Sequence, residues 1–286
     1  MTAAPRVPGD SALISTDEAI RRLREDPACS DLVRDAYLGR DVQDSARRFA
    51  ASDEFAAVLA LIGEQLVGAT VVDLGAGTGI ASAALSEAGA RRVIAIEPDG
   101  SDEVGHGAMA RGGVDVEVVA AFAEDLPLDS GSVDIVYARQ VLHHAADLEQ
   151  ALREIARVLR PGGLLLACRE HVVDDETQLS AFLAAHPVHR LAGGENAYPL
   201  NRYRSAIRHS GLALAGVLGP WDSIINAFPS VRSSEELRQL PVGWLERRFG
   251  RIGWLAGQVP IVRRLVLRKI DQREPGRLFT FIAHKR

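Results

Sequence analysis

Charged and imidazole side chains gather at the ends of two predicted strands in the second half of the chain. His143 and His144 follow the fourth predicted strand, and the trio Arg169, Glu170 and His171 follows the fifth. A positioned histidine is the commonest general base for removing a hydroxyl proton. We predict that His144, His171 and Glu170 are catalytic, with His171 as the main candidate base, and that His143 and Arg169 contact the substrate. The alternatives are a salt-bridged strand end and an architectural role for one of the paired rings.

A polar loop beyond the fifth predicted strand offers further substrate contacts. The segment 186–198 is hinged by Gly193 and Gly194 and precedes a predicted helix at 200–209. Its hydrogen-bonding groups, together with a low aromatic content of 5%, favour a hydroxylated substrate over a flat aromatic one. The substrate-binding residues predicted in this loop are His189, Glu195, Asn196 and Tyr198.

A glycine-rich turn joins another predicted strand to a helix earlier in the chain. The segment 71–79 reads Val-Val-Asp-Leu-Gly-Ala-Gly-Thr-Gly, so the backbone can approach a ligand closely at the start of the helix. Glu97 ends the next strand, where its carboxylate can accept hydrogen bonds from ribose hydroxyls. Strand, glycine loop, helix, strand and acid in this order predict an adenosine ligand rather than an ordinary tight turn.

The spacing of the glycines selects among adenosine ligands. A nicotinamide-binding loop reads G-x-G-x-x-G, whereas here Gly75, Gly77 and Gly79 follow Asp73, which would repel a pyrophosphate but suits a cationic amine. The arrangement resembles the first motif, D-x-G-x-G-x-G, of the class I S-adenosylmethionine-dependent methyltransferases. The resemblance continues through four ordered segments, Glu97-Pro98, 123–136, 141–144 and 155–163.

This resemblance implies S-adenosyl-L-methionine as the cofactor and a set of residues that hold it. Many family members carry an Asp that binds adenine where this chain has Phe122, so we expect adenine to pack on Phe122 unless this ring is ordinary core. Tyr37 and Arg48 are expected to cover the methionine end and pair its carboxylate. The predicted cofactor-binding residues are Asp73, Gly75, Ala76, Gly77, Gly79, Glu97, Pro98, Phe122, Ala123, Glu124, Arg139, Tyr37 and Arg48.

Short apolar runs separated by helical segments predict parallel strands joined by crossover helices. We predict an α/β fold with a Rossmann-like, seven-stranded methyltransferase sheet that is mostly parallel and has an antiparallel last strand. Two or three helices within 1–68 are expected to form a cap on a domain at 69–286, whose acceptor-side segment covers about 172–210. The expected strands are 70–74, 92–97, 114–121, 133–138, 163–169, 212–218 and 278–284, and the expected helices are 79–88, 105–111, 148–158 and 200–209.

Length and composition exclude several other classes. The chain has 286 residues, 47% hydrophobic and 25% charged, which is typical of a globular protein rather than a disordered or fibrous one. No run approaches the roughly 18 apolar residues of a membrane-spanning helix, and the start lacks an export signal, so a cytoplasmic protein is expected. Cys29 and Cys168 lack paired spacing, and Asp174-Asp175 is more simply a helix start, so neither a disulfide nor a metal site is predicted.

Basic residues concentrate in an insertion of about 221–275, which is predicted to be helical. The net charge is −5, which gives no reason to expect nucleic acid as a partner. Residues 241–277, however, carry nine Lys or Arg against three acidic residues and are +6, which leaves −11 elsewhere. Arginines interleaved with Trp244, Phe249 and Trp254 predict peripheral contact with anionic membrane lipids or with substrate phosphates. The alternative is a set of helices that pack on the domain and expose their arginines.

These features together predict an S-adenosylmethionine-dependent O-methyltransferase. The expected acceptor is a hydroxyl of a sugar, glycan or polyol-like molecule, either free, phosphorylated or lipid-linked, because the chain also resembles methyltransferases of bacterial polysaccharide and sugar modification. The cofactor methyl is already activated, so the site must align the nucleophile and exclude water. Three alternatives are a nitrogen, carboxylate or carbon acceptor in a natural product, a non-catalytic S-adenosylmethionine-binding protein, and a nicotinamide oxidoreductase, which the glycine spacing disfavours.

Overall fold

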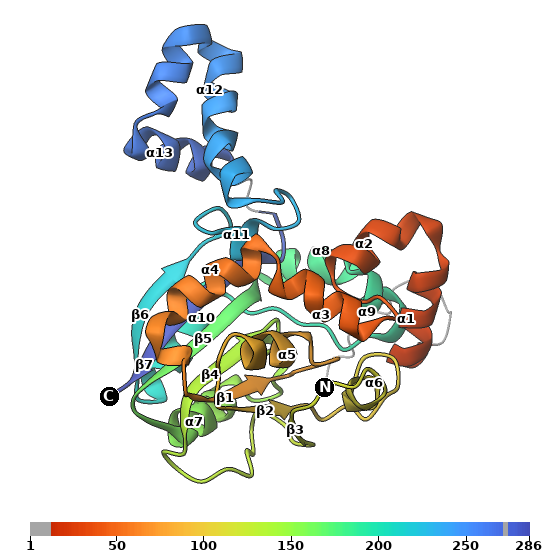
Figure 1. Cartoon of the computed structure of the whole chain (residues 1–286). Coiled ribbons are helices and arrows are strands. Elements are labelled where there is room, and N and C mark those ends of the chain that lie inside the picture. Colours follow the sequence, from red (N-terminus) through yellow and green to blue (C-terminus); the bar gives the residue numbers. More distant parts are fainter. Residues whose placement is uncertain (1–12, 271–273) are drawn as a thin grey trace, which may run out of the picture.

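A seven-stranded sheet with helices on both faces forms the centre of the computed structural model, which describes residues 13–270 and 274–286 (Figure 1). The strand order is β3-β2-β1-β4-β5-β7-β6, and every pairing is parallel except those of β7 with β5 and β6. The predicted fold class is therefore confirmed. The strands are β1 Thr70–Leu74, β2 Arg92–Ile96, β3 Glu117–Val119, β4 Val133–Arg139, β5 Leu159–Val172, β6 Leu212–Leu218 and β7 Arg277–Lys285.

Four α-helices precede β1, where the sequence predicts two or three. Ser15, Asp41 and Ser52 cap three of them, because each side chain accepts a backbone N–H from the first turn. The four are α1 Thr16–Glu25, α2 Ser30–Asp35, α3 Val42–Ala50 and α4 Asp53–Ile62. The later helices are α5 Ile80–Glu87, α6 His106–Arg111, α7 Leu148–Val158, α8 Glu176–Ala185, α9 Pro187–Ala192, α10 Leu200–His209, α11 Ile224–Ala227, α12 Ser234–Gly257 and α13 Pro260–Ile270.

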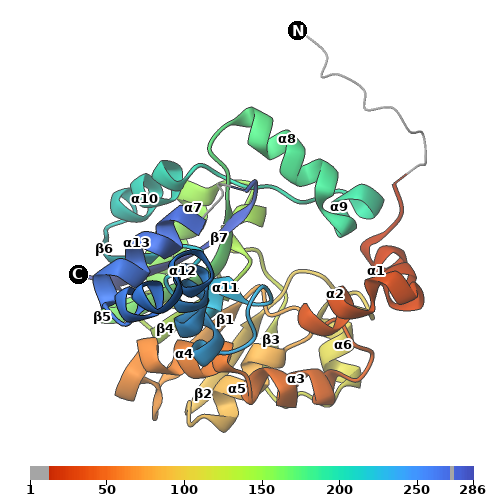
Figure 2. The same cartoon turned by 90° about the horizontal axis from the view of Figure 1, so that it is seen from above.

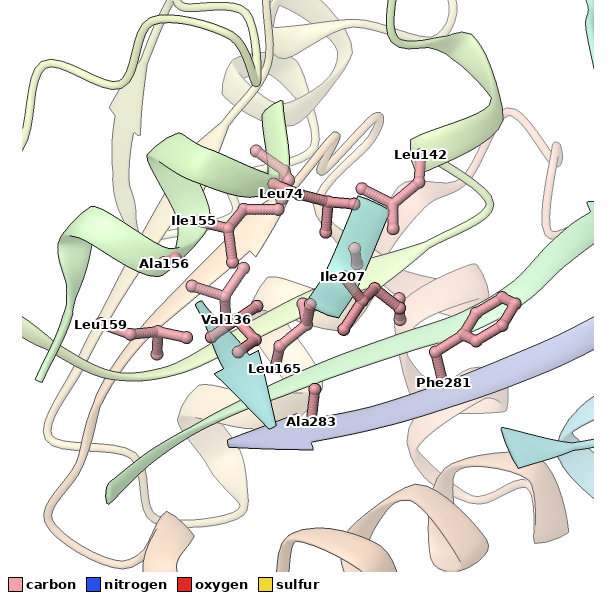
Figure 3. Packing of buried hydrophobic residues seen from close by; sticks show 14 of the residues in the cluster. Leu74, Val136, Leu142, Ile155, Ala156, Leu159, Leu165, Ile207, Phe281 and Ala283 are labelled. Carbon is pink, nitrogen blue, oxygen red and sulfur yellow. The ribbon is translucent and has the colours of Figure 1, made fainter. Parts of the chain in front are cut away.

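Two apolar layers fix the sheet between these helices. Successive strand residues point to opposite faces, so Leu165 packs with α7 and α10 whereas Leu164 and Leu166 pack with α3, α4 and α5. Figure 2 shows α10 on one side of the sheet and α3, α4 and α5 on the other. In Figure 3, Ile155 of α7 and Ile207 of α10 approach the strands of the first layer.

Two strands differ from their predicted bounds by more than one residue at an end. β3 has three residues instead of eight, because it lies at the edge of the sheet and pairs only with β2. β5 continues to Val172, because β7 pairs with it again beyond a bulge between Ala167 and Glu170. Arg169 lies in this bulge with a φ of +60°. The charged trio is therefore inside β5 and not beyond its end.

The helices α12 and α13 stand away from the sheet, at the top of Figure 1. Non-helical backbone at Gly250 divides α12 into two arms. A Cβ atom on Gly253 would overlap the carbonyl oxygen of Leu245, and one on Gly257 would lie 3.0 Å from Val242 Cα, so the second arm runs back along the first. We call residues 234–270 the projecting helices. In the described parts of the chain, no helix has the length and apolar character needed to cross a membrane.

Candidate active site

Glycine is required at two positions of the turn between β1 and α5. Gly75 and Gly79 have φ values of +62° and +79°. A Cβ atom on Gly75 would lie 2.5 Å from Val141 Cγ2, and one on Gly79 would lie 2.5 Å from Met109 Cγ. Backbone conformation and close packing therefore both exclude a side chain here.

Two cavities meet at Gly75, at the carboxyl ends of β1, β2 and β4. The larger has a volume of about 380 Å³ and the smaller about 170 Å³. All of the predicted cofactor residues except Gly79 and Arg48 line one or both of them. Those lining the larger cavity are Gly75, Glu97, Pro98, Phe122, Ala123 and Glu124, and those lining the smaller are Tyr37, Asp73, Gly75, Ala76, Gly77 and Arg139.

Glu97 is held in place by two backbone groups. The N–H of Gly77 donates to Glu97 Oε2 at 2.7 Å, and the N–H of Asp99 donates to Oε1 at 2.8 Å. Each carboxylate oxygen keeps further acceptor capacity for a ligand in the larger cavity. The predicted position of this acid beside the glycine turn follows directly from the parallel pairing of β1 with β2.

Opposite charges line the smaller cavity. Asp73 is buried and accepts a hydrogen bond from Ser82 Oγ at 2.6 Å, and its burial raises its pKa to about 7. Arg139 donates from Nε to Glu54 Oε1 at 2.7 Å, and its guanidinium carbon lies 5.6 Å from the centre of the Tyr37 ring. The smaller cavity thus offers a carboxylate for a cationic group and a guanidinium for an anionic one.

A cluster of two histidines and two glutamates borders the larger cavity. The Nδ1 atom of His143 lies 2.8 Å from Glu170 Oε2, and the Nδ1 atom of His144 lies 3.3 Å from the carbonyl oxygen of Gly194. Because each Nδ1 lies within hydrogen-bond distance of an oxygen acceptor and neither Nε2 does, we assign the proton of each neutral ring to Nδ1 and a lone pair to Nε2. Both Nε2 atoms lie 3.7 Å from Glu195 Oε2. We call His143, His144, Glu170 and Glu195 the His–Glu cluster.

The members of the cluster differ in access to ligands. His143 is buried, and burial lowers its pKa well below the usual value. The side chain of His144 is 43% exposed and lines the larger cavity. Glu170 is buried and also accepts the backbone N–H groups of Val141 and His143, so it positions the His143 ring and does not reach the cavity. The sequence predicts a catalytic role for Glu170, and these contacts are those of a residue that orients His143.

The same cluster contains the donor atoms that could hold a metal ion. One nitrogen of His143, one nitrogen of His144 and one carboxylate oxygen of Glu195 all lie within 4.8 Å of one another. Among the described residues, these three are the histidine, cysteine, aspartate or glutamate side chains that come close enough together to share a metal ion. The predicted helix start at Asp174-Asp175 is confirmed, because Asp175 caps α8 and Asp174 pairs with Arg277 at 2.8 Å.

Several predicted substrate contacts are turned toward the protein. Arg169 Nη1 donates to the carbonyl oxygens of Ile225 and Phe228 at 2.6 and 2.8 Å, because the bulge in β5 directs this side chain toward α11. The hydroxyl of Tyr198 donates to the carbonyl oxygen of Ala145 at 2.9 Å. These two side chains anchor loops around the site, and we do not propose them as substrate contacts.

His171, His189 and Arg48 also have partners within the protein. His171 Nδ1 lies 2.8 Å from the carbonyl oxygen of Gly276, and burial lowers its pKa to about 3, which makes it a weak base. His189 Nδ1 accepts the backbone N–H of Glu195 at 3.3 Å and so supports the cluster. Arg48 donates to Asp44, one turn away on α3, at 2.9 Å and lines neither cavity. Asn196 is half-buried beside Glu195 in the loop.

Comparison with known proteins decides the family. A model described as a methyltransferase domain matches residues 72–167. An uncharacterized methyltransferase of a Mycobacterium species (strain KMS) is 32% identical over 241 residues, which cover 78% of this chain and 85% of that protein. This chain belongs to the class I S-adenosylmethionine-dependent methyltransferases. Its cofactor is S-adenosyl-L-methionine, as the glycine motif predicts.

Two further similarities of this methyltransferase are informative. It is 42% identical over 99 residues to the ubiquinone/menaquinone biosynthesis C-methyltransferase of Rubrivivax gelatinosus, but the match spans only 35% of this chain and 38% of that protein. An S-adenosylmethionine-dependent methyltransferase from Mesorhizobium loti superimposes with a TM-score of 0.54 at 18% identity, covering 82% of this chain and 99% of the other. This second likeness shows the fold alone.

The two cavities of the methyltransferase suit the two ends of its cofactor. Glu97 offers acceptor oxygens for ribose hydroxyls in the larger cavity. Asp73 and Arg139 offer partners for the ammonium and carboxylate groups of the methionine portion in the smaller one. Gly75 lines both cavities and so lies where they meet, and its missing side chain leaves room for Val141, which also lines the larger cavity.

Replacing Phe122 with alanine is expected to weaken S-adenosylmethionine binding about fivefold, because an aromatic contact of this kind contributes about 1 kcal/mol. Phe122 is 67% exposed and lines the larger cavity, so it is free to cover an adenine ring and does not belong to the core. Calorimetric titration measures the change. Val118→Ala, an exposed apolar residue that lines neither cavity, is the matched control, and an equal affinity in both variants would disprove the assignment.

Several residues at the site are missing from the set that the sequence predicts, and four of them show why. Glu54 pairs with Arg139 across 85 positions of the chain, so no local pattern could reveal it. Ser82 lies one helical turn beyond the glycine motif, a position that the motif could have indicated. Gln140 lines the larger cavity, and His186 Nδ1 lies 3.7 Å from Glu195 Oε1. The polar character of segment 186–198 was the only signal for His186.

Proposed function

We propose that this methyltransferase transfers the methyl group of S-adenosylmethionine to a hydroxyl oxygen of a small polar acceptor. The observation that carries the proposal is the position of His144, which lines the cofactor cavity and whose Nε2, the ring nitrogen to which no proton is assigned, lies 3.7 Å from Glu195 Oε2. Such an atom can receive the hydroxyl proton, and the nearby carboxylate stabilises the resulting imidazolium. His144 thereby takes the role that the sequence assigned mainly to His171.

The reaction balances with the residues at hand. The acceptor oxygen forms a bond to the methyl carbon while the bond from that carbon to sulfur breaks, which releases S-adenosylhomocysteine. The hydroxyl proton moves to His144 Nε2. The protein needs no covalent intermediate, and alignment of the acceptor with the methyl group supplies most of the rate.

A sugar or polyol-like acceptor is supported by the polar groups that face this side of the cavity. Gln140 and His144 line it, and Glu195 and Asn196 lie in the loop that approaches His144. Phe122 is the only Phe, Tyr or Trp side chain among the described residues that line the larger cavity, and we assign it to adenine. A second candidate, a quinone-type ring methylated on carbon, is favoured by the similarity to the Rubrivivax gelatinosus enzyme.

Replacing His144 with alanine is expected to lower kcat by a factor of about 100 to 1,000, the range of a lost general base, with little change in cofactor affinity. Wild type is first incubated with S-adenosylmethionine that carries an isotopic label in its methyl group. Two panels of acceptors are tested separately: one contains polyols and sugars, and the other contains quinols and phenols. Mass spectrometry of the products places the label on oxygen or carbon. Labelled carbon would support the second candidate, and cofactor binding without turnover on either panel would support a non-catalytic role.

Two controls distinguish the role of His144 from nearby alternatives. His171→Ala removes a ring of the same type that lines neither cavity, and we expect a loss of less than tenfold. Addition of Zn²⁺ to chelator-treated wild type is expected to leave the rate unchanged. Zinc-dependent activation would instead assign His143, His144 and Glu195 as metal ligands.

A further inference from the structure

Exposed apolar side chains are concentrated in the projecting helices. The described residues include twelve large apolar side chains that are exposed, and seven of them lie between 249 and 265. Their exposed fractions run from 44% to 77%, and the other five are scattered over positions 13 to 122. The seven are Phe249, Ile252, Trp254, Leu255, Val259, Ile261 and Leu265. A contiguous segment with this much apolar exposure indicates an interaction surface.

These exposed side chains are not what holds the two arms of α12 together. The arms approach where two glycines of the second arm meet the first, Gly253 against Leu245 and Gly257 against Val242, and these four residues are buried. The aromatic and aliphatic side chains around the bend at Gly250 point into solvent instead. Their exposure is therefore a property of the folded helices and is available to a partner.

The same helices carry an unbalanced positive charge. Between 246 and 269 there are seven Lys or Arg residues and one acid, Glu246, so this segment is +6 while the rest of the chain is −11. In the described structure none of the seven lies within ion-pair distance of a carboxylate. The basic residues are Arg247, Arg248, Arg251, Arg263, Arg264, Arg268 and Lys269.

We propose that the projecting helices dock the methyltransferase on a membrane surface rich in anionic lipids. Aromatic and aliphatic side chains would enter the interface between headgroups and acyl chains, while arginines contact lipid phosphates. The negative remainder of the protein would be repelled by the same surface, so the helices face the lipid and the sheet faces away (Figure 1). A second copy of the chain is a poorer occupant, because it would bring another +6 segment against this one. The proposal is independent of the acceptor.

Sedimentation with lipid vesicles tests this proposal on the full chain. Wild type is mixed with vesicles of pure phosphatidylcholine or of phosphatidylcholine with 30% phosphatidylglycerol, at low and high salt. We expect at least tenfold more bound protein on the anionic vesicles at low salt and loss of this binding at high salt. Equal recovery in the supernatant with both compositions would overturn the proposal.

Two sets of variants separate charge from apolar insertion. Arg247→Gln with Arg248→Gln and Arg251→Gln is expected to reduce vesicle affinity at least tenfold, and Trp254→Ser with Leu255→Ser to abolish the blue shift of tryptophan fluorescence on binding. Arg204→Gln with Arg208→Gln, on the exposed side of α10, is the matched charge control and should bind normally. Circular dichroism verifies folding of each variant. Vesicle binding equal to wild type by both sets of variants in the projecting helices would contradict lipid docking. A dimer in solution that Leu255→Ser dissociates would also contradict it.

Discussion

Replacing Asp73 with asparagine is expected to weaken S-adenosylmethionine binding about 100-fold while making the protein without cofactor more stable. The affinity falls because the buried carboxylate loses its charge, and a buried charge partner typically contributes 2 to 5 kcal/mol, so a loss of about 2.7 kcal/mol is reasonable. The stability rises because Asp73 is ionised at pH 8 in a buried site, where its pKa is about 7. Asparagine can still accept the hydrogen bond from Ser82 Oγ.

The gain in stability has a definite dependence on pH. A carboxyl group with a raised folded-state pKa destabilises the protein above its unfolded pKa of about 3.9, and the effect grows until the pH reaches the folded value. The free energy of unfolding of Asp73→Asn should therefore equal that of wild type near pH 4 and exceed it increasingly up to about pH 7. Above that pH the difference should stay constant, at as much as about 4 kcal/mol. Urea unfolding across this range measures the difference. A constant difference at all pH values would rule out ionisation as the cause.

Cofactor affinity should follow the same ionisation. A cationic amine selects the charged carboxylate, so wild-type affinity is expected to fall about tenfold per pH unit below about pH 7, whereas that of Asp73→Asn stays level. The exposed Asp115→Asn serves as the matched control for both measurements. If the variant and wild type bind the cofactor equally at pH 8, Asp73 does not contact the ligand.

Replacing Glu54 with glutamine is expected to destabilise the protein by about 3 to 5 kcal/mol, because it leaves buried guanidinium groups without a counter-charge. Glu54 pairs with Arg139 at 2.7 Å and lies 3.8 Å from Arg169 Nε. Its burial would raise its pKa, but the two arginines hold the pKa below its usual value. Thermal and urea unfolding measure the loss, which is a large part of the total stability of an ordinary protein.

The ionised Glu54 stabilises the folded protein, whereas the ionised Asp73 destabilises it, so the two variants change the free energy of unfolding in opposite directions at high pH. A lowered folded-state pKa contributes stability above the unfolded pKa of about 4.3, and that contribution disappears as the pH falls through the folded value. Wild type and Glu54→Gln should therefore converge in acid. Glu64→Gln, an exposed residue in the same part of the chain, should behave as wild type. An unfolding free energy of Glu54→Gln within 1 kcal/mol of wild type at pH 8 would contradict the assigned role of the pair.

The sheet and the cofactor cavity could be predicted because their signals are local. Each of these signals is read from a short stretch of sequence. They are the glycines at fixed spacing, the acid at the end of the next strand and the alternating apolar runs. The roles of Arg169 and Tyr198 could not be predicted, because their partners, the carbonyl groups of Ile225 and Ala145, are distant in sequence and carry no side-chain signature. His171 was the favoured base on its position alone, and only burial reveals its low pKa.

The bulge in β5 determines that Glu170, and not its neighbour Arg169, contacts His143 of the His–Glu cluster. Along a regular strand, alternation would place Cys168 and Arg169 on opposite faces, yet Cys168 packs in the layer of α4 and Arg169 reaches α4 and α11 as well. This extra residue shifts the phase of the strand, so Glu170 meets His143 and not Glu54. Without the bulge, regular alternation of the same residues would turn Glu170 toward Glu54 and set two acids together in the interior, whereas deletion of Arg169 would leave Glu170 facing His143. Homologues that keep the same number of residues in this strand but lack the bulge should therefore differ at position 54 or 170.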